Sequence, residues 1–593
     1  MSNRNIAIFF LIAVVLLYSN TLKNPFHFDD FHSIIENPHI RAMKNIPAFF
    51  VDTQTFSVEQ GGKMFRPLLL ISYSINYAIH GYDVRGYRLF NILLHFFCVI
   101  GLMQLAYLLG ADKRMSCSMG LLFLVNPLVA ESINYVSSRS DLFVSFFVIW
   151  SIGFLLSKEN RYALGIAFFV LGFLVKSMAI VMPPLLFLCD RSRKLWQNVY
   201  KKKFLIMSLC CVVLLYLSVI YQNSFLEDSL HKTPRGFVEQ AFTHIKAQVY
   251  ITWLCIMPVR LTVDHPFNPA TTEITRAILC SILLIFSVTI FAIRARSHWL
   301  SIGWIWKIIA LLPYAFIPLN LIVTERRIYL ALIGVSVILA WVFTMCRDKK
   351  YFGSYGFYIL IVIWVGITIS RSAVWSSDIV LWNEAVNYNS NNPRALINLG
   401  LAYERNGNLT KAERYILEGL SLDPKIASGW LHLGNLQFNS GKHSEAERSY
   451  FRAISEQPNH AGSYYNLGNI FLGRGEIAKA EEFYVRAINL NPNLALAYNN
   501  LGQIYESYGK SIEALGAYQK SNDADPELPQ PYYNRAVLLE KMGDHNSALN
   551  DYSQAYKLME SLKDSDEINL SRRFQLKALQ GINRLRDSID EEK

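Results

Sequence analysis

The sequence predicts an all-α protein in two parts, a polytopic α-helical membrane domain followed by an α-solenoid of short repeats. Apolar residues make up 52% of the 593 residues, and they are concentrated in the first 370, in stretches long enough to cross a bilayer. The remainder has a soluble composition and an internal period of 34 residues. From residue 391 onward the chain carries 23 Lys and Arg against 26 Asp and Glu, so the net charge of +11 belongs to the membrane part.

The first part is expected to contain about eleven membrane crossings. Nine of them are apolar stretches of about bilayer length. The other two are shorter apolar stretches on either side of Lys176. The first has Arg4 before it and no small-residue cleavage site after it, which is typical of a retained anchor. The expected crossings cover residues 6–22, 89–109, 116–133, 141–157, 161–175, 177–189, 204–222, 275–293, 300–320, 325–345 and 353–370.

Basic residues in the short loops between these stretches predict the orientation and indicate topology signals rather than nucleic-acid binding. Residues 113–114, 191–203 and 347–350 fall on the same side as the N-terminus. That side is expected to be cytoplasmic, so the first loop and everything after Arg371 face a bacterial periplasm or the lumen of the endoplasmic reticulum. The half-polar segment 237–258 is expected to be re-entrant or a surface helix, because a crossing there would place the later basic loops outside.

The second part contains a repeat that can be checked by subtraction. Three kinds of residue recur with one spacing. They are small residues that let two helices approach, aromatic residues that fill the gap, and prolines that end the second helix. Positions spaced by 34 are Leu396, Trp430, Tyr464, Tyr498 and Tyr532; Gly400, Gly434, Gly468, Gly502 and Ala536; Ala412, Ala446, Ala480, Ala514 and Ala548; and Pro424, Pro458, Pro492 and Pro526. After a membrane domain at 1–375 we expect a connecting half-repeat at 376–392, five helix pairs at 393–562, and a capping helix and tail at 563–593. Such a solenoid presents a concave groove that by default binds peptide or protein.

The first loop carries two adjacent carboxylates, Asp29 and Asp30, directly after the first crossing, and His32 and Glu36 follow them. Placing a carboxylate at the edge of hydrocarbon costs free energy that Asn or Ser would avoid, so the pair needs a reason. One reason is structural: Asp30 caps a short helix and Asp29 lies at the positive end of its dipole. The other is catalytic, since a carboxylate can accept the proton of an acceptor hydroxyl as a general base.

Several stretches resemble the transmembrane and tetratricopeptide-repeat-containing protein O-mannosyltransferases and, more distantly, other polytopic glycosyltransferases of the GT-C type that use polyprenyl-phosphate sugars. The resemblance implies a helical membrane domain with its active site in the first outward loop, and sugar transfer from a lipid phosphate to a hydroxyl outside the cytoplasm. The matching stretches are FHFDDFHSIIENP (26–38), FRPLLLISYSIN (65–76), FNILLH (90–95), NPLVAESINYVSSRSDL (126–142), ERRIYL (325–330) and SSDIVLWNEAV (376–386), together with the 34-residue repeats.

The resemblance also implies roles for single residues. By match to the first Asp of the family's acidic pair, Asp29 is expected to be the base, with Asp30 orienting it. The leaving phosphate needs positive charge rather than an acid, and Arg326 is the leading candidate because ERRIY matches the family's Glu-Arg-x-x-Tyr. The other outward-facing cations are Arg66, His95, Arg139, Lys176 and Arg327, of which Arg66, His95 and Lys176 are the further phosphate-binding candidates. Supporting candidates are Glu131, Arg139 and Glu325. For all of these except Asp29 and Arg326, a structural role in packing or an ion pair is the favoured alternative.

One position departs from the family pattern. Where the family commonly shows Lys-Glu at the start of a span, Lys176 is followed here by Ser177. Either that acid is supportive, or the activity is altered. A membrane-anchored scaffold with a degenerate catalytic domain, whose repeats recruit protein partners, therefore stays open as an alternative. A lipid-carrier transporter also fits many spans but gives no reason for the acidic pair.

No cofactor and no required metal are expected, because the lipid-linked sugar is a substrate. The eight cysteines show no paired spacing, which predicts neither a disulfide framework nor a zinc site. His27, Asp29, Asp30 and His32 could be drawn as ligands, but hard cations usually take oxygen ligands from several segments. The expected partners are a polyprenyl-phosphate sugar, a polypeptide at the repeats and the bilayer, and no nucleic acid.

Overall fold

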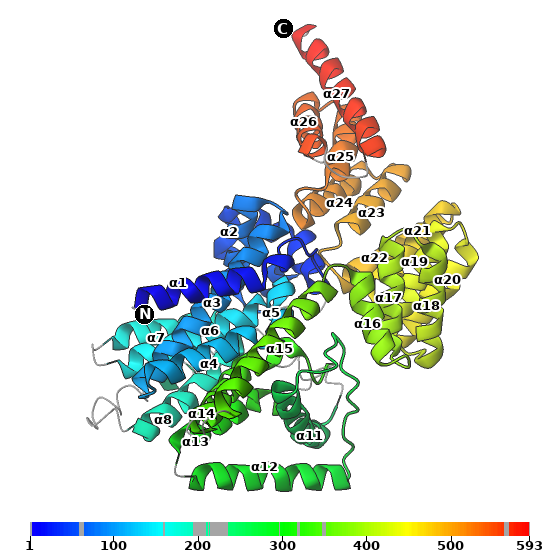
Figure 1. The fold of residues 1–593 in the computed structure, drawn as a ribbon. Helices are drawn as coiled ribbons and strands as arrows, with labels where there is room; N and C mark the ends of the chain where they lie inside the picture. The colour runs from blue at the N-terminus through cyan, green and yellow to red at the C-terminus, as the bar shows by residue number, and fades with distance from the viewer. Residues whose placement is uncertain are drawn as a thin grey trace. The chain divides into compact units, whose positions relative to one another are not determined.

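The computed structural model describes residues 3–57, 64–157, 161–193, 209–210, 213, 235–295, 297–316, 321–346, 352–561 and 568–591. Within these ranges the chain is helical and has no β-strand (Figure 1). It divides into two compact units, residues 1–395 and 396–593. The predicted all-α fold class is confirmed.

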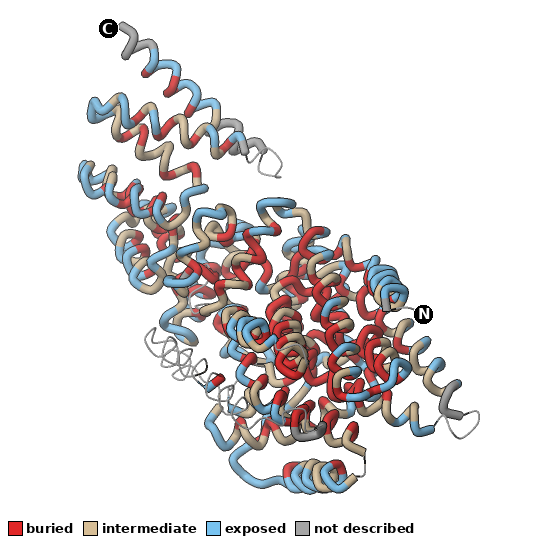
Figure 2. Tube along the Cα trace, turned by 90° about the vertical axis from the view of Figure 1, so that its left-hand side faces the viewer, coloured by how far each residue is buried: buried red, intermediate tan, exposed pale blue. Residues whose placement is uncertain are grey.

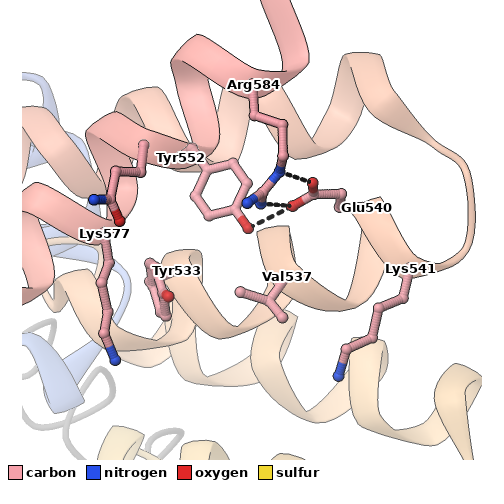
Figure 3. Close-up of a pocket in the computed structure, with 8 residues that line it drawn as sticks. Tyr533, Val537, Glu540, Lys541, Tyr552, Lys577 and Arg584 are labelled. Atoms are coloured by element: carbon pink, nitrogen blue, oxygen red, sulfur yellow. Dashed lines mark hydrogen bonds and ion pairs between the residues drawn. The ribbon is translucent and has the colours of Figure 1, made fainter. Parts of the chain in front are cut away.

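The first unit is a bundle of helices joined by short helical turns. Its core runs through α1, α3, α4, α6, α8, α13, α14 and α15, and Figure 2 shows the buried residues gathered in its interior. The helices are α1 (Asn3–Leu17), α2 (Pro67–His80), α3 (Val84–Leu108), α4 (Lys113–Val125), α5 (Val129–Asn134), α6 (Arg139–Leu156), α7 (Tyr162–Phe173), α8 (Met182–Arg193), α11 (Phe237–Ile256), α12 (Arg276–Arg294), α13 (His298–Leu311), α14 (Glu325–Cys346), α15 (Phe352–Val374) and α16 (Asp378–Tyr388).

Five stretches in this unit are helical, long and apolar enough to cross a membrane, which is the composition of a multi-span membrane protein. They are Val84–Leu108, Val136–Leu156, Arg276–Arg294, Glu325–Cys346 and Tyr355–Val374. The stretch Tyr355–Val374 of α15 and most of α12 are apolar yet little buried, as expected of helices that face lipid. Shorter apolar helices cover Arg4–Leu17, Tyr162–Phe173 and Ser177–Asp190.

Most predicted crossings coincide with helices, with two qualifications. The stretch 204–222 lies almost entirely outside the described residues. The expected crossing 116–133 is wrong as a single helix: α4 ends at Val125, and α5 begins only at Val129. The cause is Pro127, because the residue before a proline is pushed out of the helical region, and Asn126 is indeed extended (φ −63°, ψ 124°). Helix α11, from the ambiguous segment 237–258, is not among the five stretches long and apolar enough to cross.

The second unit consists of consecutive helix pairs followed by one long helix. The pairs begin with α17 (Pro393–Arg405), whose first residues belong to the first unit, and α18 (Leu409–Leu422). The others are α19 (Ala427–Asn439) with α20 (His443–Glu456), α21 (Ala461–Gly473) with α22 (Ile477–Leu490), α23 (Ala495–Ser507) with α24 (Ser511–Ala524), and α25 (Pro529–Lys541) with α26 (His545–Ser561), followed by α27 (Ile568–Glu591).

Close contact between the two helices of a pair explains the small residue of the repeat. A Cβ atom added at Gly434 would lie 2.5 Å from the ring of Tyr450, and one at Gly468 would lie 2.6 Å from the ring of Tyr484. The glycine is therefore required for close approach, as predicted, but the ring that meets it comes from the second helix of the same pair. The turn within each pair also holds a glycine with positive φ, at residues 407, 441, 475, 509 and 543, a further 34-residue series.

Candidate active site

Asp29 lies in the turn between α1 and the short helix Phe31–Ile35, and its carboxylate is open. Its side chain is 54% exposed. Its backbone N–H donates to the hydroxyl of Tyr135 (3.2 Å), and its backbone oxygen accepts from Ser33 Oγ (2.5 Å). The preceding residue, Phe28, has φ +47°, an unfavourable conformation for a side chain of this size. Edge contacts of the Phe28 ring with Trp382 (5.1 Å between centroids) hold it there, so the backbone presents Asp29 in one fixed direction.

Asp30 is fully buried and serves a different purpose. Its carboxylate accepts hydrogen bonds from Ser137 Oγ (2.6 Å), Ser137 N (2.7 Å), His27 N (3.1 Å) and Val136 N (3.2 Å). Asp30 thus ties the first loop to the turn between α5 and α6. The expectation that its side chain caps the following helix is wrong, because it makes no capping bond there. Its oxygens are already used by the other segment.

The groups around Asp29 favour its charged form. Partial burial raises the pKa of the carboxyl group, but the hydrogen bond to His32 and the charge of Arg326 outweigh burial. The pKa of Asp29 therefore lies well below its ordinary value. His32 Nε2 is 3.6 Å from Asp29 Oδ1, and its Nδ1 is 2.8 Å from Ser57 Oγ. At neutral pH Asp29 is a carboxylate.

Arg326 lies beside this carboxylate, in the first turn of α14. Its guanidinium carbon is 4.7 Å from the centre of the Tyr135 ring, and its Nε is 3.9 Å from Glu131 Oε1. The other oxygen of Glu131 accepts from the backbone N–H of Glu325 (3.0 Å). Burial raises the pKa of Glu131 above its ordinary value, and the charge of Arg326 opposes this. Glu131 thus fixes the start of α14 and helps to hold Arg326, as a supporting residue would.

A second group of cations adjoins Arg326. Lys176 pairs with Asp141 (Nζ to Oδ1, 2.5 Å). Burial lowers the pKa of Lys176 to about 8, Asp141 opposes the shift, and the charges of Arg66 and Arg327 add to it. The Tyr314 hydroxyl lies within the electrostatic range of Arg66, Arg326 and Arg327. We call Arg66, Lys176, Arg326 and Arg327 the basic cluster; all four are among the outward-facing cations that the sequence predicts.

Arg139 and His95 are placed differently from the basic cluster. Arg139 is fully buried, and its guanidinium donates to Asn91 Oδ1 (2.9 Å), the Tyr87 carbonyl (3.1 Å) and Ser72 Oγ (3.1 Å). His95 is also fully buried, with Nδ1 2.6 Å from the Tyr329 hydroxyl and Nε2 3.4 Å from the Leu124 carbonyl. Both side chains join helices of the core, which favours the structural alternative for them.

Helix α14 is further held by a buried ion-pair network that sequence reasoning missed. Arg371, near the end of α15, donates to both oxygens of Glu325 (3.2 and 3.3 Å) and to Glu384 in α16. His265 Nε2 lies 3.6 Å from Glu325 Oε1. Glu325, a predicted supporting residue, pairs with Arg371. The stretch SSDIVLWNEAV, which matched the family, contains Glu384 and could have indicated the network.

Metal-ligating groups are not gathered in this site. Within the described ranges, no three or more His, Cys, Asp or Glu side chains are placed so that they could hold a metal ion.

The fold and this site define a polytopic helical membrane protein that carries a solenoid of tetratricopeptide repeats and an acidic residue next to a cluster of cations. Tetratricopeptide-repeat families match residues 393–426, 427–460, 461–494, 483–516 and 529–560.

The resemblance to protein O-mannosyltransferases is confirmed by similar curated proteins. The chain is 22% identical over 447 residues to "Protein O-mannosyl-transferase F38B6.6" of Caenorhabditis elegans, covering 71% of this chain and 63% of the relative. It is 22% identical over 485 residues to "Protein O-mannosyl-transferase TMTC3" of Mus musculus, covering 72% and 52%. The chain thus spans between half and two-thirds of the length of these relatives.

Two solved structures are similar to part of this chain. MamA is 26% identical over 28% of this chain and 98% of its own (TM-score 0.26). YrrB is 20% identical over 34% of this chain and 97% of its own (TM-score 0.27).

Proposed function

We propose that the protein is an integral-membrane glycosyltransferase, a protein O-mannosyltransferase, that moves mannose from a polyprenyl phosphate to Ser or Thr hydroxyls of a polypeptide. One observation carries this proposal: the exposed carboxylate of Asp29 lies within the electrostatic range of Arg326, which belongs to the basic cluster. A base for a hydroxyl and a binding site for a phosphate are the two things that this transfer needs.

In the proposed reaction Asp29 accepts the proton of the acceptor hydroxyl, while the oxygen of that hydroxyl bonds to the anomeric carbon of the sugar. The bond between that carbon and the phosphate oxygen breaks, and its electron pair leaves with the lipid phosphate. A carboxylate with a low pKa is a weak base, so Asp29 works best late in the transfer, once bond formation has made the hydroxyl proton acidic. Asp30 fixes the loop and takes no part in proton transfer.

The basic cluster would bind the phosphate. Negative charge collects on the phosphate as the sugar departs, and Arg326 can meet it with two parallel N–H groups. Lys176 adds a second cation, and its partner Asp141 keeps it placed. No acid is required, because the leaving phosphate is already an anion.

The repeats would hold the acceptor polypeptide. In the second pair, Asn435 Oδ1 accepts from Tyr450 Oη (2.9 Å) and from Asn466 Nδ2 of the next pair (2.8 Å). The same arrangement recurs one repeat later with Asn469, Tyr484 and Asn500. Amide side chains have donor and acceptor capacity beyond these bonds, which suits binding to the main chain of an extended polypeptide.

The proposal includes an orientation in the membrane. The positive-inside rule puts the N-terminus in the cytoplasm and both Asp29 and the repeats on the opposite face, in a periplasm or in the lumen of the endoplasmic reticulum. Cysteines introduced at Asp52 and at exposed Lys442 should then react with a membrane-impermeant maleimide from the non-cytoplasmic face, whereas one at Lys113 should not. Labelling of residues 52 and 442 from opposite faces would contradict this orientation.

The test of the activity is transfer by the purified full-length protein. Wild type and Asp29→Asn are given mannosyl or glucosyl polyprenyl phosphate with cell-envelope protein as acceptor, and modified peptides are identified by mass spectrometry. We expect mannose transfer by the wild type and loss of at least a hundredfold in the variant, the usual value of a general base. Unchanged transfer by Asp29→Asn would refute the mechanism.

A second candidate function is a membrane-anchored scaffold whose repeats recruit proteins. Ser177, at the position where the family has an acid, favours it. Failure of the wild type with every polyprenyl-phosphate sugar tested, together with stable capture of partners by the full-length protein, would establish this second function instead.

A further inference from the structure

Tyr135 touches both of the groups on which the proposed transfer depends. It follows α5 directly and is almost completely buried. Its hydroxyl accepts the backbone N–H of Asp29 (3.2 Å), and the guanidinium of Arg326 lies over its ring, 4.7 Å from the centroid. We propose that Tyr135 is a positioning residue that places Asp29 through its hydroxyl and Arg326 through its ring. This role rests on the proposed function. It adds to that function a single side chain that links the base to the phosphate-binding site.

The Tyr135 side chain is itself held firmly enough to act in this way. Its ring stacks against Trp375 (6.2 Å between centroids, 19° between planes) and meets Phe28 edge to face (5.5 Å). Its backbone N–H donates to the Glu131 carbonyl (3.0 Å), and its own carbonyl accepts from Ser138 Oγ (2.6 Å). Packing and main-chain bonds therefore fix the ring before any substrate arrives.

The hydroxyl acts on Asp29. By accepting the Asp29 N–H it fixes the peptide plane from which the exposed carboxylate projects. A hydrogen bond between the Tyr135 hydroxyl and the Asp29 carboxyl also contributes to the low pKa of Asp29, after the contributions of His32 and Arg326. Removing the hydroxyl should make the carboxylate less well placed and easier to protonate.

The ring acts on Arg326. Glu131 Oε1 is 3.9 Å from Arg326 Nε, which is too long for a hydrogen bond, and the face of the Tyr135 ring therefore contributes to the orientation of the guanidinium. A phenylalanine at 135 would keep that face, whereas a leucine would remove it. Two substitutions at position 135 can therefore separate the effect of the hydroxyl on Asp29 from the effect of the ring on Arg326.

The experiment compares Tyr135→Phe and Tyr135→Leu in the full-length protein in lipid vesicles. For Tyr135→Phe we expect a lower kcat, an acid limb of the pH–rate profile moved upward by about half to one pH unit, and an unchanged KM for the donor. For Tyr135→Leu we expect these changes together with a donor KM raised about fivefold to tenfold. A merely structural tyrosine would lower the amount of folded protein without moving the acid limb or the KM.

Tyr87→Phe is the matched control. Like Tyr135, Tyr87 is buried, its hydroxyl bonds to the backbone, and its ring lies beside a guanidinium. The Tyr87 hydroxyl donates to the Gly81 carbonyl (3.1 Å), and the ring centroid lies 5.7 Å from the guanidinium carbon of Arg139. It lies outside the group formed by Asp29 and Arg326. Loss of its hydroxyl should leave the acid limb and the donor KM as in the wild type.

Two further readouts keep the positioning role testable if the protein proves not to transfer sugar. The rate at which a water-soluble carbodiimide modifies Asp29 reports its protonation, and in Tyr135→Phe modification should persist to higher pH. Binding of a short-chain polyprenyl phosphate should weaken in Tyr135→Leu and not in Tyr135→Phe. Wild-type values in both variants for carbodiimide reactivity and lipid binding would overturn the proposal, whereas altered values without transfer would overturn only the proposed function.

Discussion

His27 and Asp378 join the first loop of the membrane unit to the segment that leads into the repeats. His27 Nδ1 lies 2.6 Å from the Asp378 carboxylate, and Nε2 lies 2.9 Å from the Trp375 carbonyl. The two ring nitrogens are thus held between a carboxylate and a backbone carbonyl. Since Phe28 and Asp29 follow His27 directly, a charge-assisted bond to α16 fixes the start of the loop that carries the candidate base.

Asp378→Asn tests this link. The substitution keeps a hydrogen-bonding partner for the His27 ring but removes the carboxylate charge. We expect the free energy of unfolding to fall by about 1–3 kcal/mol, the range for a hydrogen bond between charged groups, and transfer to fall with it. Thermal unfolding in detergent and the transfer rate measure the two effects. The control is Asp83→Asn, which alters an exposed pair with Arg85 and should leave both unchanged.

The pH dependence of transfer should be set by Asp29 on its acid side. The pKa of Asp29 is lowered in the folded protein, so its favourable contacts are present above the free-Asp value of about 4 and are lost only as the pH falls through the lower folded value. Transfer should therefore persist to about pH 4. His32→Ala removes a group that lowers this pKa, so the acid limb of log(kcat/KM) should move upward. An unmoved limb, or an equal movement in the exposed solenoid variant His443→Ala, would contradict this assignment.

Lys176 gives a separate prediction on the alkaline side. The pKa of Lys176 is lowered to about 8, so its charge is present below that pH and is lost as the pH rises through it. Binding of a polyprenyl phosphate to the wild type should weaken by about tenfold between pH 7 and pH 9.5, because one cation of the basic cluster is lost. Lys176→Arg should keep its affinity over this range, since arginine stays charged. The same alkaline loss in Lys176→Arg would show that another group titrates.

The buried pair of Arg371 and Glu325 should matter for stability more than for chemistry. Both side chains are almost completely buried, so Arg371→Leu leaves the Glu325 charge without its main partner. Removing one partner of a buried ion pair costs about 3–5 kcal/mol, which should appear as a large fall in the thermal unfolding temperature. The double variant with Glu325→Gln removes the stranded charge and should recover part of the loss. A double variant less stable than Arg371→Leu would show that Glu325 has other essential partners.

Sequence reasoning predicted the parts of this protein that depend on periodicity and composition. The helix pairs follow from the 34-residue period, and the length of the apolar stretches predicted most of the helices of the first unit. Pro127 was not taken into account, and α4 ends before it, within one predicted crossing. Asp29 and Arg326 were each assigned to the site by resemblance to the family, from motifs far apart in the sequence. Tyr135 and Arg371 were missed because their roles arise from packing between segments distant in sequence, which spacing along one chain does not reveal.

Two glycines of α21 test the packing rule of the repeats. A Cβ atom at Gly468 would lie 2.6 Å from the Tyr484 ring, whereas one at Gly473 would have no atom within 4 Å. Gly468→Ala must therefore push the two helices of the pair apart, at a cost of about 1–3 kcal/mol for overpacking. Gly473→Ala should be neutral or stabilising by up to about 1 kcal/mol, because alanine favours the helix. Urea unfolding followed by circular dichroism measures both, and equal effects of the two substitutions would show that close approach is not what requires glycine at position 468.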